Sequence, residues 1–197
     1  MEKDYPLFPL TVNVLPGGYL PLQIFEPRYL DMIKESLNQD QGFCVVLLQS
    51  NKIETSTKSL PQHYMVGTYV EIVDFNQLEN GLLGITVQGK HRIKVLDRKS
   101  RDDNLLIGTV LEITEEQESV SLEPEYDNIW KMLKEISSHP EIQNLKLDID
   151  FKSSSSVVYN LASLLPLTPP ERQKILEAQS NIKRLDHLSQ LIKKLGG

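Results

Sequence analysis

Residues 6–29 read PLFPLTVNVLPGGYLPLQIFEPRY, an apolar stretch that five prolines interrupt. Each proline removes a backbone donor and restricts the chain, so a continuous helix is excluded here. The stretch is predicted to form extended segments or strand edges, and Gly17 and Gly18 permit a tight turn between its two arms. Pro27 suits the first turn of a helix, which is predicted to begin at this point.

The helix after Pro27 is predicted from the spacing of the apolar residues that follow. Leu30, Ile33 and Leu37 fall on one helical face, whereas the charged residues between them fall elsewhere. We expect this apolar face to pack on a sheet or to cover the end of a barrel.

The rest of the first 115 or so residues is predicted to be mainly β-structure. Apolar residues recur at every second position over residues 104–114, which is the period of a strand. An Asn-Gly pair at residues 80–81 favours a hairpin turn. Two further turns are predicted, at the Gly-Lys pair of residues 89–90 and at residues 102–104. The expected sheet is therefore a meander of antiparallel strands.

The character of the sequence changes after residue 115. An acidic stretch with a proline is followed by helical periodicity, so we place a domain boundary near residue 120. A β-rich domain over residues 1–118 and a helical domain over residues 119–197 are expected. The predicted fold class is α+β.

Three helices are predicted in the second domain. The first covers residues 126–136, and the second follows the serines of residues 153–156, whose hydroxyls can cap free amides. The third begins at a capping box, with Thr168 as the cap and Glu171 three residues later. Its apolar stripe predicts one continuous helix from Thr168 to Leu195.

Composition and charge exclude several classes of function. The chain has 21 basic and 27 acidic residues and a formal charge of -6, which disfavours nucleic acid as a partner. Cys44 is the single cysteine and lies in an apolar run, so we expect it to be buried and unreactive. No segment approaches about 18 uninterrupted apolar residues, and the first residues do not resemble a leader sequence. A cytoplasmic protein without a membrane partner is expected.

The sequence offers little support for catalysis. Residues 84–91, GITVQGKH, have the glycine and lysine spacing of a phosphate-binding loop, but the final Ser or Thr is missing and a strand is predicted there. The histidines lack the short spacings of a metal site, and no serine lies in a nucleophile turn. We expect no enzymatic activity, no cofactor and no metal.

The run over residues 6–29 resembles the opening signature of the Lon protease N-terminal, substrate-binding domain family, in particular the small bacterial members that consist of this domain alone. Later segments resemble the family in the same order. Residues 43–49 and 66–74 resemble its next strands, and residues 81–95 its glycine-containing hairpin. Residues 164–195 resemble its terminal leucine-rich helix, so the resemblance covers nearly the whole chain.

This resemblance implies a β-rich pseudo-barrel of about six strands followed by a helical subdomain. It also implies recognition of unfolded or hydrophobic polypeptide segments, with a role as an adaptor in proteolysis or quality control. A protease or a chaperone is the expected protein partner, and a second copy of the chain is expected to form at most a weak homodimer. Complete Lon proteases add an ATPase module and a serine-lysine protease module, so their hydrolytic activity is not carried over. The alternative hypothesis is a small-ligand sensor or accessory domain that uses a cleft between the two subdomains.

Five residues are candidates for polypeptide contact: Phe25, Arg28, Tyr64, Met65 and Tyr69. The first two belong to the opening signature, where core packing for the ring and a local ion pair for the guanidinium are the simpler interpretations. The other three lie beside the polar segment of residues 51–63, which is predicted to act as an adaptable flap.

Overall fold

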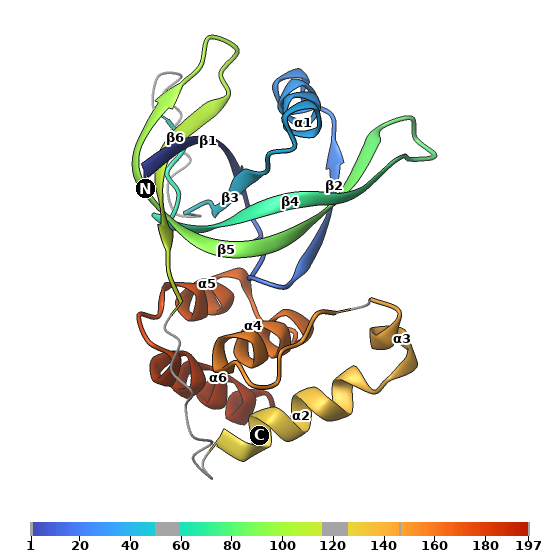
Figure 1. Ribbon diagram of the computed structural model, residues 1–197, viewed down its shortest axis with the longest axis vertical. Coiled ribbons are helices and arrows are strands. Elements are labelled where there is room, and N and C mark those ends of the chain that lie inside the picture. The colour runs from blue at the N-terminus through green and yellow to red at the C-terminus, as the bar shows by residue number, and fades with distance from the viewer. Residues whose placement is uncertain (1, 50–59, 116–125, 146, 197) are drawn as a thin grey trace. The chain divides into compact units, whose positions relative to one another are not determined.

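A computed structural model describes residues 2–49, 60–115, 126–145 and 147–196 (Figure 1). The chain forms two compact units, one of Met1–Val14 and Tyr19–Ile113, the other of Leu15–Gly18 and Thr114–Gly197. The first contains a sheet and one helix, and the second is helical. The predicted α+β class is confirmed. The boundary expected at residue 118 lies outside the described residues.

The sheet of the first unit is mixed and closes on itself (Figure 1). Its strand order is β2-β5-β4-β3-β1-β6, and β5 also pairs with β6. The pseudo-barrel is therefore present, although β1 runs parallel to β3, so the predicted all-antiparallel meander is wrong. The strands are β1 (Glu2–Leu10), β2 (Tyr19–Ile24), β3 (Phe43–Leu47), β4 (Val66–Gln77), β5 (Leu83–Ser100) and β6 (Leu106–Ile113).

The turn predicted at residues 89–90 is also wrong. β5 continues through it as one strand of 18 residues. The pairing with β4 shifts register here, because Tyr69 lies opposite His91 and Val70 opposite Gly89. Such an irregularity bends a strand without ending it. The strand therefore bends near Gly89. β4 pairs with β5 on both sides of this bend, whereas β2 pairs with β5 before it and β6 after it.

The other two predicted turns are confirmed. Gly81 has a φ of 80°, and its N–H donates to the Leu78 carbonyl at 2.8 Å. Asn104 has a φ of 65°, and the N–H of Arg101 donates to the carbonyl of Leu105 at 2.8 Å. Both turns place a residue in the left-handed region, which Gly and Asn tolerate best.

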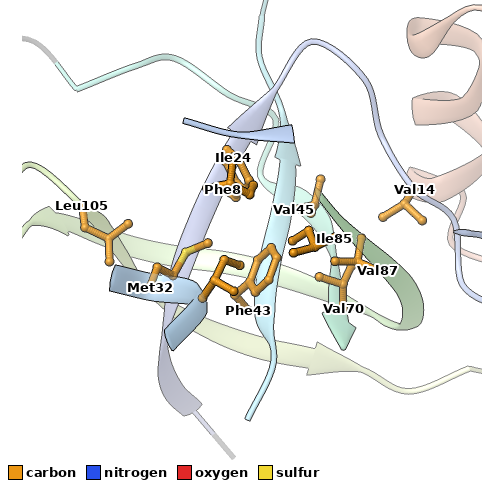
Figure 2. Packing of buried hydrophobic residues seen from close by; sticks show 11 residues of the cluster. Phe8, Val14, Ile24, Met32, Phe43, Val45, Val70, Ile85, Val87 and Leu105 are labelled. Carbon is orange, nitrogen blue, oxygen red and sulfur yellow. The ribbon is translucent and has the colours of Figure 1, made fainter. Parts of the chain in front are cut away.

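The opening stretch supplies much of the core of the first unit. Phe8 and Ile24 pack with Phe43 and Val45 of β3 in one buried cluster (Figure 2). The helix α1 (Pro27–Gln39) adds Met32 and Ile33, whereas Leu37, which was expected on its buried face, is 43% exposed. A second buried cluster includes Cys44. Burial raises the pKa of its thiol, as expected of an unreactive cysteine.

The glycine before β3 is required by a close backbone approach. A Cβ at Gly42 would lie 1.9 Å from the Val70 carbonyl oxygen and 2.8 Å from the Tyr69 ring. The Gly42 N–H also donates to the Tyr69 hydroxyl at 2.7 Å. β4 and its tyrosine therefore occupy the space that any other residue would need.

We predict that Gly42→Ala lowers the free energy of unfolding by about 3 kcal/mol or prevents folding, because neither the carbonyl nor the buried ring can move aside freely. Gly196→Ala is the control, since a Cβ at Gly196 meets nothing within 4 Å. Urea unfolding followed by circular dichroism measures both. Equal midpoints for the two variants would contradict the close approach.

The second unit contains the helices α2 (Asp127–Ser137), α3 (Pro140–Gln143), α4 (Ser154–Leu164), α5 (Pro169–Glu177) and α6 (Asn181–Gly196). The Ser153 hydroxyl caps α4 by accepting from the Ser156 N–H. The single helix predicted from Thr168 to Leu195 is wrong, because α5 ends at Glu177 and α6 begins at Asn181.

The break between α5 and α6 has two local causes. The hydroxyl oxygen of Ser180 accepts from the N–H of Lys183 at 3.3 Å, so Ser180 starts a new helix. Ala178 leaves the helical region, and its carbonyl accepts from Arg184, which is fully buried. Arg184 also forms an ion pair with Glu115 at 2.9 Å. The break therefore supplies an acceptor for a buried charge.

The capping box at the start of α5 is confirmed. The Glu171 carboxylate accepts from the Thr168 N–H at 2.9 Å and from the Thr168 hydroxyl at 2.8 Å, and the reciprocal bond to the helix backbone is present. Lys194 of α6 reaches the same carboxylate at 2.9 Å. These contacts lower the pKa of Glu171 to about 2, with Lys194 as the largest cause.

We predict that Thr168→Ala lowers the free energy of unfolding by about 1 kcal/mol, because an amide at the helix start loses its partner. The measurement is the urea midpoint at constant m-value. An unchanged midpoint would mean that α5 does not take part in the cooperative transition.

Candidate functional site

An apolar cavity of about 370 Å³ opens in the first unit. It is enclosed by the ends of β1 and β2, the start of α1, and the turn between β5 and β6. Apolar residues form most of its surface, with a few polar groups at the edge. The residues that line it are Phe8, Pro9, Leu10, Leu22, Gln23, Ile24, Phe25, Glu26, Arg28, Tyr29, Leu48, Leu60, Pro61, Ser100, Asn104 and Leu106.

Phe25 is exposed at this cavity because of the way β2 passes into α1. Pro27 occupies the first turn of α1 and keeps the residue before it out of the helical region. Glu26 is accordingly extended, with φ -80° and ψ 131°. Phe25 lies between the strand and the helix, and it is 67% exposed. Most of this large apolar side chain is thus left uncovered by the described residues.

Two stacked rings help to line the cavity. The ring of Phe8 lies 4.1 Å from that of Tyr29, centroid to centroid, and the Arg28 guanidinium carbon lies 4.8 Å from the Tyr29 ring. Burial raises the pKa of the Tyr29 hydroxyl. The phenol therefore stays neutral at physiological pH, so Tyr29 itself adds no charge to the cavity.

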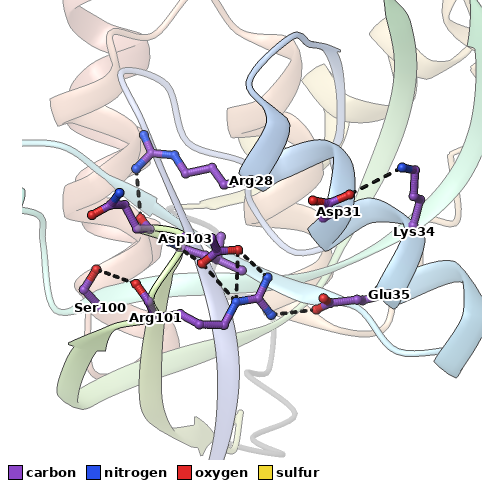
Figure 3. Close-up of polar contacts among 9 residues, drawn as sticks. Arg28, Asp31, Lys34, Glu35, Ser100, Arg101 and Asp103 are labelled. Atoms are coloured by element: carbon purple, nitrogen blue, oxygen red, sulfur yellow. Dashed lines mark hydrogen bonds and ion pairs between the residues drawn. The ribbon is translucent and has the colours of Figure 1, made fainter.

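Arg28 is held in place at the edge of the cavity. Its guanidinium contacts the Glu26 carboxylate at 2.7 Å. Its Nη1 donates to the Asn104 carbonyl at 2.9 Å (Figure 3). The cation and the anion neutralise each other, so the lining of the cavity has no net charge. Arg28 thereby fastens the start of α1 to the turn between β5 and β6.

A second arginine fixes the same turn from the other side. Arg101 contacts Asp103 at 2.6 Å and Glu35 of α1 at 2.9 Å (Figure 3). Hydrogen bonding to Arg101 lowers the pKa of Asp103 to about 2, and the Asp103 carboxylate also accepts from the Leu105 N–H. Two arginines therefore hold the turn that contributes Asn104 to the cavity.

The structure brings two of the five candidate residues to this cavity, Phe25 and Arg28. Tyr64 is half-buried and Met65 is exposed, and neither lines it. Tyr69 is 9% exposed, stacks on His91 at 4.8 Å and packs against Tyr5. Its position is that of a core residue.

The predicted flap falls largely outside the described residues, which exclude residues 50–59. Its end is described, and Leu60 and Pro61 line the cavity. The segment is joined to the chain after β3 by a bridge between Leu48 and His63. Arg98 of β5 also donates to the Pro61 carbonyl at 2.9 Å.

Sequence reasoning missed the polar residues Ser100 and Asn104. The turn at residues 102–104 was predicted, but its contact with Arg28 was not, because Arg28 lies 76 positions earlier in the chain than Asn104. Residues 84–91, which have the spacing of a phosphate-binding loop, lie within β5 and do not form a loop.

Within the described ranges, no group of three or more His, Cys, Asp or Glu could hold a metal ion. None of the helices in these ranges is long and apolar enough to cross a membrane.

A family model of the ATP-dependent protease La (LON) substrate-binding domain matches residues 4–194. The chain belongs to this family. The Lon protease of Buchnera aphidicola is 27% identical over 195 residues, which cover 94% of this chain and 24% of that protein. The chain therefore spans about a quarter of the length of this curated Lon protease.

Solved Lon domains share the fold. The Lon N-terminal domain protein of Xanthomonas campestris is 29% identical with a TM-score of 0.74, and the match covers 97% of this chain and 98% of that one. The N-terminal domain of a Mycobacterium avium complex Lon protease is 16% identical with a TM-score of 0.73. The second likeness shows the fold alone.

One buried histidine belongs to the segment at the cavity of this Lon domain. His63 is 3% exposed, and its Nδ1 lies 2.7 Å from the Tyr64 carbonyl oxygen. That oxygen can only accept, so Nδ1 carries the proton and Nε2 does not. Nε2 is buried with no hydrogen-bond partner among the described residues. Burial lowers the pKa of His63 and keeps the ring neutral.

We predict that this histidine destabilises the folded state at low pH. In the unfolded chain it takes up a proton at about pH 6.5, whereas the folded state binds it only at lower pH. The stability that depends on the neutral ring is thus fully present above about pH 6.5, and it is lost as the pH falls through the depressed pKa of the folded state. Melting temperatures between pH 7.5 and 5.5 should fall less for His63→Asn than for the unmodified chain. His139→Asn, at an exposed position, should keep the original profile. Identical profiles for all three would exclude this role.

Proposed function

We propose that this chain is a non-catalytic recognition module that binds unfolded or hydrophobic polypeptide segments at the cavity of its first unit. The observation that carries the proposal is Phe25, an exposed ring at the edge of an apolar cavity of about 370 Å³. Burying a Phe side chain contributes about 1.5–3 kcal/mol, which favours a partner that covers it. Membership of the Lon substrate-binding domain family supports polypeptide as that partner.

The geometry of the cavity favours apolar contact over charge. The Glu26 and Arg28 side chains are paired with each other at 2.7 Å. A ligand that relied on either charge would have to break this pair. The overall charge of -6 gives no strong field to attract acidic ligands.

We further propose that the bound segments are presented to a protease or a chaperone, so that the chain acts as an adaptor in proteolysis or quality control in the cytoplasm. A weak homodimer is compatible with this role. The family match concerns the substrate-binding domain of Lon, and the chain corresponds to 24% of the Buchnera Lon protease. Hydrolysis is therefore not assigned to it.

The purified chain is expected neither to hydrolyse ATP nor to cleave casein. The first is measured by phosphate release and the second by release of acid-soluble fluorescence. Activity that remains with the chain through a denaturing purification and refolding would overturn the non-catalytic assignment.

For binding, Phe25→Ala should weaken the affinity for a labelled, aromatic-rich peptide about tenfold, which corresponds to about 1.4 kcal/mol. Phe75→Ala is the matched control, because Phe75 is also an exposed ring, at 59%, but does not line the cavity. Fluorescence anisotropy at low and high salt measures both. The affinity should survive added salt, since only exposed charges are screened over about 10 Å at 0.1 M.

Three results would count against the proposal: equal effects of the two substitutions, loss of binding in salt, or no binding at all. The last result would favour the alternative function, a small-ligand sensor or accessory domain. That alternative uses a cleft between the two subdomains and not the cavity of the first unit.

A further inference from the structure

β2 has a pairing partner on one side alone. Among the described residues it pairs only with β5, and it stands at one end of the strand order. An edge strand presents a row of N–H and C=O groups that can pair with another chain. Many proteins block such an edge with charged side chains or with proline. β2, YLPLQI, has no charged side chain, and Pro21 removes one donor from it.

The same strand forms part of the cavity. Ile24 belongs to the core cluster, and Leu20 and Leu22 pack against it, so this alternate set of side chains faces the interior. Leu22 and Ile24 also line the cavity. A strand added beside β2, about 4.8 Å away, would direct every second side chain to the same face. Those side chains would be directed toward the cavity.

The position of Pro21 indicates which main-chain groups face outward. Proline has no N–H, and a sheet tolerates it on an edge strand where the missing donor would have faced solvent. The alternation then assigns Tyr19, Pro21 and Gln23 to the outer edge. This edge offers the N–H groups of Tyr19 and Gln23 and the carbonyls of all three.

Part of β4 is also unpaired on one side, because Glu71–Gln77 pairs with β5 alone. That edge carries Glu71 and Asp74, and charged side chains discourage strand addition. None of its residues lines the cavity. Of β2 and this stretch of β4, β2 is the one that adjoins the apolar cavity.

We propose that β2 takes up an extended, unfolded stretch of polypeptide as an additional strand, whose alternate apolar side chains enter the cavity. The proposal rests on the proposed function and specifies its substrate. A helix has satisfied its own backbone groups, and a small molecule or nucleic acid lacks a repeating row of N–H and C=O groups. The paired charges of Glu26 and Arg28 leave the cavity suited to uncharged side chains.

The test uses a labelled nine-residue peptide with apolar residues at every second position. Two further versions carry N-methyl groups, either on the amides of the apolar residues or on those of the intervening residues. Antiparallel addition to Tyr19, Pro21 and Gln23 uses the amides of the intervening residues, and parallel addition uses those of the apolar residues. One methylated version should therefore bind at least tenfold more weakly, and the other within about twofold of the unmodified peptide.

Amide hydrogen exchange supplies an independent measurement. The bound unmodified peptide should slow exchange at the Tyr19 and Gln23 amides. Protection over Glu71–Gln77 instead would overturn the assignment to β2.

The outcomes separate the two proposals. If the unmodified peptide binds and methylation has the same effect in both versions, the added strand is excluded while the proposed function stands. If the unmodified peptide does not bind, both fail.

Discussion

The pairing of β5 with three other strands is the constraint on which the first unit depends. β2, β4 and β6 each pair in register with this one strand. A slip of one residue in any of these pairings would turn every core side chain of that strand to the opposite face. Val87 on one part of β5 and Val95 on the other are fully buried in separate clusters, so both parts must be in register together. The bend near Gly89 is what allows one strand to meet both requirements.

Features governed by local chemistry could be predicted from the sequence. Pro27 at a helix start, the turn at residues 102–104 and the Thr168 capping box each act through neighbours a few residues away. The bend at Gly89 and the break at Ala178 were not predicted, because each also involves a partner distant in the chain. The first depends on β4, and the second accompanies the burial of Arg184, whose charge needs acceptors from several segments.

The candidate site could be predicted from the sequence only in part, for the same reason. Phe25 and Arg28 were selected from the opening signature, and both line the cavity. The turn that supplies Asn104 becomes a neighbour of Arg28 only after the sheet has closed. Tyr69 was chosen because it is aromatic and lies near a polar segment, but sequence gave no sign that the Gly42 amide and two rings enclose it. Two arginines fix the edge of the cavity before any ligand arrives, which reduces the entropy lost on binding.

The register of β1 against β6, in which Glu2 lies opposite Leu111, has a consequence for synthesis of the chain. β1 is synthesised before β6, so the pairing of these two strands must wait for the last strand of the sheet. About 100 residues separate them, and at about 5–20 residues per second this delay is on the order of 5–20 s. During that interval Leu7 lacks Leu106, its partner in β6, although β3 is already available to pair with it. A chain proposed to recognise unfolded polypeptide thus passes through a nascent stage in which its own first strand is still incompletely paired.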